Sequence, residues 1–138
     1  MSDDAVREWR ERVVREHMVS ENEHRFDDTI ATFSHPRYEL VATGEVHDGE
    51  AAVREYFRAG RALVPDQRNE LIAMHHADGA VIVEAWLRGT PIAAVNPYRR
   101  GFECRIIAVF EFDPDGIVCE RAYWDRQTIL DQIRAAAN

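Results

Sequence analysis

Apolar residues recur along this chain with two different periods, one typical of helices and one typical of strands. In four segments they return every three or four positions, which predicts amphipathic helices with one buried side. The third helix is expected to open at Asp48-Gly49-Glu50, with Asp48 as its N-cap, and to stop at Pro65. The helical segments are residues 5–22, residues 26–33, the stretch from Asp48 to Pro65, and about 126–137.

In other segments apolar and polar residues alternate, which predicts strands with one buried face. Ala77-Asp78-Gly79 and Pro114-Asp115-Gly116 have the composition of tight turns, so they join neighbouring strands into antiparallel hairpins. A long loop with two prolines runs from Thr90 to Gly101. The expected strands are residues 38–47, 68–76, 80–89, 102–112 and 117–124.

This order of elements predicts an α+β fold in a single domain, residues 1–138. Helices followed by an antiparallel meander give a curved, mainly antiparallel sheet wrapped around three helices, with a further helix at the C-terminus. Such a sheet would enclose a pocket at its wide end. A length of 138 residues suits one hydrophobic core and leaves no room for a second.

Composition and charge exclude several classes of function. The chain has 25 acidic residues against 17 basic ones, all of them arginine, and its net charge of −8 argues against general nucleic-acid binding. No apolar run approaches the roughly 18 residues of a membrane span, and Met1 to Arg12 lacks the apolar core of a signal peptide. Cys104 and Cys119 form no CxxC motif, so we expect reduced thiols in a cytoplasmic protein.

Two stretches near the C-terminus resemble the closing motif of a known family. Glu120-Arg121-Ala122-Tyr123-Trp124-Asp125, followed by Ile129-Leu130-Asp131-Gln132-Ile133, is similar to the tail of SnoaL-like proteins, which are polyketide cyclase-type members of the nuclear transport factor 2-like superfamily. The same resemblance extends to Asn22, Gly49 with Tyr56, Pro65-Asp66 and Gly89-Thr90. It implies a cone-shaped fold and a homodimer formed through the sheet. It specifies the activity poorly, because the superfamily includes cyclases, isomerases, dehydratases and non-catalytic binders.

The chain departs from the family's cyclases at two positions that matter for chemistry. Ala122 stands where the resemblance implies an acid/base aspartate, and Ala108 stands where it implies a histidine on the neighbouring strand. If these alanines face the cavity, strand alternation turns Glu120 the same way, and the mixed residues on the other face suit a dimer interface. We therefore expect a largely apolar pocket whose ligand-binding residues are Met18, Tyr56, Trp86, Ala108, Phe110, Ala122 and Trp124.

Three ionisable residues are candidates for catalysis. His17 lies on the apolar stripe of the first helix, either as a hydrogen-bonded core residue or as an acid/base group that titrates near neutral pH. Glu84, beside Trp86 on its strand face, is expected to be a proton-shuttling acid or the ion-pair partner of an arginine such as Arg88. Asp125 ends a strand just before a helix, where it would act as a general base or as the cap of that helix.

These candidates lead to two functional hypotheses. The first is a cofactor-independent cyclase, isomerase or dehydratase that acts by proton transfer on a hydrophobic small molecule. The second is a non-catalytic ligand-binding or protein-interaction module that has lost the family's acid/base residues. The sequence has no nucleophile motif and no phosphate-binding loop, and His75 and His76 face opposite ways on a strand. Neither a cofactor nor a metal is therefore expected.

Overall fold

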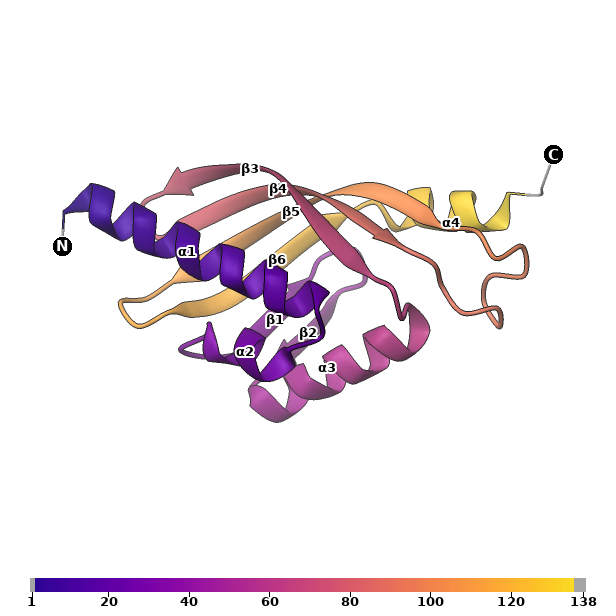
Figure 1. Ribbon diagram of the computed structural model, residues 1–138, viewed down its shortest axis with the longest axis horizontal. Coiled ribbons are helices and arrows are strands. Elements are labelled where there is room, and N and C mark those ends of the chain that lie inside the picture. Colours follow the sequence, from indigo (N-terminus) through magenta and orange to yellow (C-terminus); the bar gives the residue numbers. More distant parts are fainter. Residues whose placement is uncertain (1, 136–138) are drawn as a thin grey trace.

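The computed structural model describes residues 2–135, and Figure 1 shows how its elements are arranged. The helices within this range are α1 (Asp3–Asn22), α2 (Phe26–Ala31), α3 (Glu50–Leu63) and α4 (Arg126–Arg134). The strands are β1 (Arg37–Leu40), β2 (Glu45–Asp48), β3 (Arg68–Ala77), β4 (Ala80–Gly89), β5 (Phe102–Phe112) and β6 (Ile117–Trp124). Among the described helices, none combines the length and apolar character needed to cross a lipid bilayer.

The six strands form one curved sheet in the order β2-β1-β6-β5-β4-β3. All neighbouring strands in it are antiparallel except β1 and β6, which run parallel. Helices α1, α2 and α3 lie on one side of the sheet, and α4 lies beyond the end of β6 (Figure 1). The α+β fold predicted from the sequence is thereby confirmed. The side of the sheet that faces α1 to α3 is called the inner face below, and the opposite side is called the outer face.

The long strands follow the alternation of the sequence closely. β5 and β6 span the predicted residues 102–112 and 117–124, because turn residues mark their shared hairpin and β-branched and aromatic residues are frequent in both strands. In β4 every second residue is buried on the inner face, beginning with Val81 and Val83. The inner face therefore carries the core, and the residues between its positions point outward.

The early strand and the start of α3 differ from the prediction. Residues 38–47 do not form a single strand, because β1 and β2 are separated by a turn at residues 41–44, in which Gly44 has a φ of +77°. Asp48 is not the cap of α3, since Gly49 occupies that position with a φ of +91°. The Asp48 carboxylate instead contacts His35 Nε2 at 2.7 Å. The positive φ values explain why glycine stands at both positions.

Buried apolar side chains form two hydrophobic core clusters. The larger cluster lies between the inner face and α1 to α3, and it includes Val14, Tyr38 and Phe57. The smaller cluster attaches α4 to the sheet and includes Leu87 and Ile133. Full burial of a large apolar side chain contributes about 1.5–3 kcal/mol to stability. Both clusters therefore hold rigid walls around the space between the sheet and the helices.

Candidate active site

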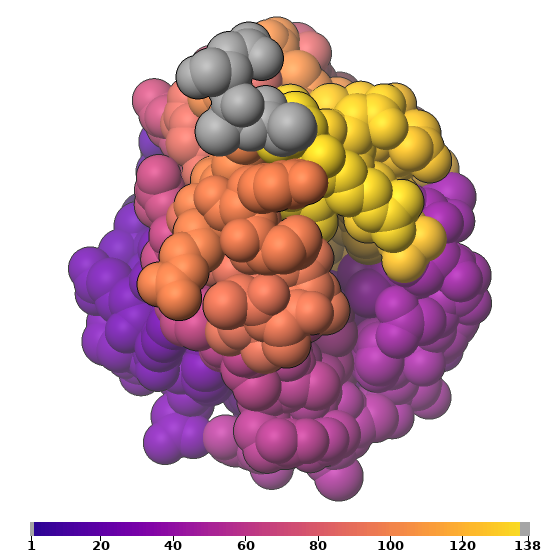
Figure 2. Space-filling model, turned by 90° about the vertical axis from the view of Figure 1, so that its right-hand side faces the viewer, coloured from indigo at the N-terminus to yellow at the C-terminus, as the bar shows by residue number. Residues whose placement is uncertain are grey.

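An apolar cavity of about 440 Å³ lies between the inner face, α1, α3 and α4. This volume is within the range of small-molecule binding sites. Figure 2 looks onto the end of the molecule where α4, in yellow, meets α3 and the loop after β4, with a recess between them. Of the residues predicted to bind a ligand, those that line the cavity are Met18, Tyr56, Ala108, Phe110, Ala122 and Trp124.

Glu84 and Trp86 lie on the outer face, so the expectation that they would line the cavity is corrected. Glu84 contacts His75 Nε2 at 2.8 Å, and the guanidinium groups of Arg88 and Arg105 lie 5.3 and 4.9 Å from the centre of the Trp86 ring. The two faces of a strand differ by a shift of one residue, and in β4 the five buried positions are Val81, Val83, Ala85, Leu87 and Gly89, which alternate with the positions of Glu84 and Trp86. Neither Glu84 nor Trp86 touches the space in which a ligand would sit.

Asp125 is the N-cap of α4 and is exposed rather than turned into the cavity. Its carboxylate accepts hydrogen bonds from the backbone N–H of Gln127 at 3.0 Å and from Thr128 Oγ1 at 2.8 Å. The Thr128 hydroxyl and the helix N–H groups hold the pKa of Asp125 below its usual range. Of the two roles that the sequence left open for Asp125, the structure therefore favours capping.

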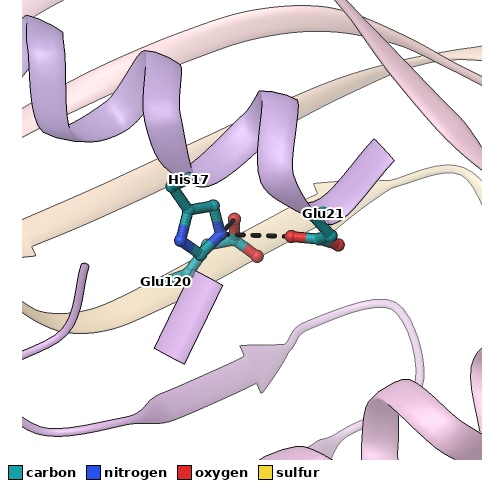
Figure 3. A group of neighbouring side chains, drawn as sticks. All are labelled: His17, Glu21 and Glu120. Carbon is teal, nitrogen blue, oxygen red and sulfur yellow. Dashed lines mark ion pairs between the residues drawn. The ribbon is translucent and has the colours of Figure 1, made fainter. Parts of the chain in front are cut away.

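His17 is fully buried and lies between two carboxylates (Figure 3). Its Nε2 atom is 3.1 Å from Glu21 Oε2 and 3.2 Å from Glu120 Oε1. Glu21 is one helical turn further along α1, while Glu120 comes from β6, where it shares the inner face with Ala122. Both carboxylates line the cavity, so the imidazole connects two acids that a ligand can reach.

The two carboxylates differ in how many partners stabilise their charge. Glu21 accepts hydrogen bonds from Arg61 Nη2 at 3.1 Å and from the Tyr38 hydroxyl at 3.2 Å, in addition to its contact with His17. Burial opposes the charge of Glu21, but His17 and Arg61 outweigh burial and hold its pKa far below the usual range. For Glu120, burial outweighs the contact with His17 and raises the pKa. Two acids pushed in opposite directions are a common signature of acid/base sites.

The hydrogen bonds of His17 also assign its tautomer. Thr32 Oγ1 donates to the carbonyl oxygen of Thr29 at 2.6 Å, so it must accept from His17 Nδ1, which lies 3.0 Å away. Nδ1 therefore carries a hydrogen, and the exchangeable proton of the ring is the one on Nε2, between the carboxylates. Burial lowers the pKa of His17, but the hydrogen bonds to Glu120 and Glu21 outweigh burial and raise it to about 9.

The same three residues could in principle bind a metal ion. The ligand atoms of His17, Glu21 and Glu120 all lie within 4.8 Å of one another. However, Arg61 already neutralises Glu21, and a proton on Nε2 occupies the lone pair through which the imidazole would bind a cation. The arrangement therefore favours a shared proton over a bound cation.

Sequence analysis selected His17 but not the four residues around it, which are Glu21, Glu120, Tyr38 and Arg61. Glu21 follows His17 by four residues, which is the spacing of neighbours on a helix, so a local signal was present. Glu120 was placed on the inner face by alternation but was not selected as a candidate. Tyr38 and Arg61 come from β1 and α3, and only tertiary packing brings them to Glu21.

The fold and the cavity define a nuclear transport factor 2-like protein, with a curved sheet that closes over helices around an internal pocket. Residues 14–121 match the family described as the SnoaL-like domain, and the chain belongs to that family. Comparison with curated protein sequences gave no match.

Solved structures with the same fold are similar over nearly the whole chain. One is a hypothetical protein with a ketosteroid isomerase-like fold from Catenulispora acidiphila, in complex with trimethylamine (TM-score 0.80, 14% identity, 90% of this chain and 93% of that chain). Another is TerC co-crystallised with polyporic acid (TM-score 0.76, 8% identity, 90% and 97%). A third is IdmH from Streptomyces antibioticus, for which a polyketide cyclase activity has been proposed (TM-score 0.74, 15% identity, 91% and 98%). At these identities the likeness shows the fold alone.

Proposed function

We propose that this protein is a cofactor-independent acid/base catalyst, a cyclase, isomerase or dehydratase, that moves protons on a hydrophobic small molecule. The observation that carries the proposal is the cluster of His17, Glu21 and Glu120 on the wall of an otherwise apolar cavity. Small-molecule sites typically combine apolar walls with a few convergent polar groups. Proton transfer is the chemistry that such a cluster supports without any further group.

Glu120 is the residue that exchanges a proton with the ligand in this proposal. It faces the cavity, and burial raises its pKa toward the range in which a carboxylate is an effective general base. It would take a proton from a carbon next to a carbonyl group, leaving an enolate, and would return that proton to another atom of the ligand. His17 stabilises the ionised Glu120 before it takes the proton and again after it returns the proton, and the ionised Glu21 stabilises the imidazolium.

Tyr56 is the candidate for stabilising the negative charge that develops on the ligand oxygen. It lines the same cavity from α3, and burial together with Glu21 raises its pKa, so its hydroxyl stays protonated. A protonated hydroxyl in an apolar site donates a strong hydrogen bond to an oxyanion. Tyr56 therefore complements Glu120 as donor and base in one pocket.

The proposal is tested by deuterium exchange at the α-carbons of 2-tetralone, a hydrophobic ring ketone, followed by NMR in D2O. We expect the wild-type protein to accelerate exchange over buffer, and Glu120→Gln to lose about 10²- to 10⁴-fold of that acceleration. Glu84→Gln is the matched control, because it neutralises a carboxylate that also contacts a histidine but on the outer face. Exchange by Glu120→Gln at the wild-type rate would reject Glu120 as the base.

The alternative is a ligand-binding module without catalysis. Two observations favour it, since Ala108 and Ala122 line the cavity at the positions where the family resemblance implies catalytic groups. It predicts that 2-tetralone or a similar ring ketone binds in the cavity while its exchange rate stays that of buffer. Calorimetry and NMR on the same samples distinguish binding without exchange from binding with exchange.

We also propose that two copies of the chain associate through the outer face of the sheet. Apolar side chains such as Ile107, Val109 and Tyr123 lie there among charged ones, and Tyr123 is 41% exposed. A surface of this mixed composition resembles the interfaces between subunits. Light scattering is expected to give twice the mass of one chain, and Ile107→Glu is expected to halve it. A wild-type mass of one chain would reject the dimer.

A further inference from the structure

The cavity-facing stripe of α4 has charged ends. A helix that packs on a core usually fills positions i, i+3, i+4, i+7 and i+8 with apolar residues. In α4 the middle of that stripe is apolar, but its first and last members are arginines, and both face the cavity. The residues of this stripe that line the cavity are Arg126, Ile129, Leu130, Ile133 and Arg134.

These two arginines have no acidic partner within residues 2–135, although the chain carries an excess of acids. Some other arginines are ion-paired, as Arg54 is with Asp27 and Arg121 with Glu111, whereas exposed ones such as Arg7 also lack an acidic partner in this range. Arg126 and Arg134 differ from those exposed arginines because they line the cavity. The acids of α4 and its cap are engaged elsewhere, since Asp125 accepts from Thr128 and Asp131 accepts from Gln127. Two guanidinium groups at the rim of an apolar cavity are thus available to an anion.

The helix itself explains only one of the two charges. A cation near a helix C-terminus is stabilised by the helix dipole, and Arg134 ends α4. Arg126 occupies the first position of the same helix, where the dipole disfavours a cation. Its position therefore has no explanation in helix stability, and its place on the cavity wall points to a ligand.

The two polar regions of the cavity also define a direction. Glu21, whose pKa is held low, and Glu120 repel a negative charge on one side, while the arginines of α4 attract one at the rim. Between them lie apolar walls that include Phe110 and Trp124. A ligand with one charged end would enter with its apolar body toward Glu120 and its charged end at α4.

We propose that the ligand of this cavity is an amphiphilic carboxylate, whose carboxylate lies at the rim in the positive field of Arg126 and Arg134 while its apolar body fills the cavity. The guanidinium group suits this class, because its planar donors match the two oxygens of a carboxylate. The proposal rests on the cavity being the ligand site of the proposed function, but not on the proton transfer. A carboxylate is thereby distinguished from the neutral ring ketones that the cavity would otherwise accept.

The experiment compares 2-naphthylacetate with 2-naphthylacetamide by isothermal titration calorimetry. The two probes share an apolar body and differ in the charge of one end. We expect wild-type protein to bind the acid more tightly than the amide, and Arg126→Gln and Arg134→Gln each to weaken acid binding about two- to fivefold. Amide binding should not change. The double variant should bind acid and amide equally, and added salt should weaken only the acid in the wild type.

Arg7→Gln is the matched control, because it removes the same charge from an exposed position on α1. It should keep the preference for the acid. Three results would each overturn the proposal. The wild type binds both probes equally, the Arg126 and Arg134 substitutions weaken both probes equally, or neither probe binds at millimolar concentration. Glu120→Gln separates the two proposals, because it should lose proton exchange and keep the preference for the acid. If the wild-type protein shows no proton exchange but both proteins prefer the acid, catalysis is rejected and the carboxylate site is retained.

Discussion

Two contacts between a histidine and a glutamate lie on opposite faces of the sheet, and their surroundings differ. On the outer face His75 Nε2 is 2.8 Å from Glu84, and the side chains are 56% and 38% exposed. On the inner side His17 Nε2 is 3.2 Å from Glu120, and the side chains are 0% and 12% exposed. The outer contact is shorter, but water screens it, and exposed pairs contribute about 0–1 kcal/mol. Burial, rather than distance, gives the inner cluster its chemistry.

The largest expected difference between these two regions is in stability. Glu21→Gln leaves the buried charge of Arg61 without its acidic partner and leaves His17 with Glu120 alone. Loss of one member of a buried ion pair typically costs about 3–5 kcal/mol. Glu84→Gln should stay within about 0.5 kcal/mol of the wild type, since it alters an exposed position. Urea denaturation of both variants measures the difference, and equal losses would contradict the role of burial.

A second prediction concerns the pH dependence of stability. The pKa of His17 in the folded protein is about 9, above the 6.5 of an unperturbed histidine. A raised pKa means that the contribution of His17 is complete below about pH 6.5 and is lost as the pH rises through 9. The shift corresponds to about 3 kcal/mol. Urea denaturation between pH 6 and 9.5 should show this decline in the free energy of unfolding.

Two variants assign that decline to one residue. His17→Gln cannot titrate, so its free energy of unfolding should vary less between pH 6 and 9.5 than that of the wild type. His75→Gln removes the histidine of the outer face and should keep the wild-type slope. If His17→Gln kept the full slope, another group would be responsible, and the buried imidazole would not be charged at neutral pH.

A smaller effect is expected from the residue that orients the imidazole. Thr32→Val removes the acceptor of the Nδ1–H while keeping the shape of the side chain, and it should cost about 1 kcal/mol. The pKa of His17 should fall, because the hydrogen bond that Nδ1–H donates is stronger from the charged ring than from the neutral ring, so its loss costs the charged form more. Histidine nitrogen chemical shifts followed through a pH titration of the wild type and of Thr32→Val report this change. An unchanged His17 titration would show that Thr32 has no part in orienting the ring.

Local patterns of the sequence were sufficient for most of the fold. Residues 102–112 and 117–124 are rich in β-branched and aromatic residues and are separated by turn residues, so both strands could be predicted. Residues 38–47 were misjudged because a short turn at Gly44 interrupts a segment whose apolar content continues through it. The glycine inside this strand-like pattern is the signal in the sequence that indicates an interruption of the strand.

The site was less accessible from the sequence, because its members meet only in three dimensions. Either face of β4 could line the cavity, and the sequence prediction assigned the face of Glu84 and Trp86 to it. The charges of Glu84 and Arg88 indicate instead that this face is in contact with water. His17 and Glu21 are neighbours on one helix, whereas Arg61 is 40 positions from Glu21 in the chain. No local period reports a contact of that separation.

Asp125 has an expected effect on stability no larger than that of Thr32, and it separates a structural carboxylate from a chemical one most clearly. Asp125→Ala removes the cap of α4 and should cost about 1 kcal/mol, while Asp125→Ser, which can still cap, should restore most of that loss. Proton exchange on 2-tetralone should be the same in both variants, since the Asp125 side chain does not line the cavity. A loss of exchange in Asp125→Ser at wild-type stability would make Asp125 part of the chemistry. Capping predicts the opposite pattern, in which stability follows the hydrogen bond to Gln127 and the exchange rate does not.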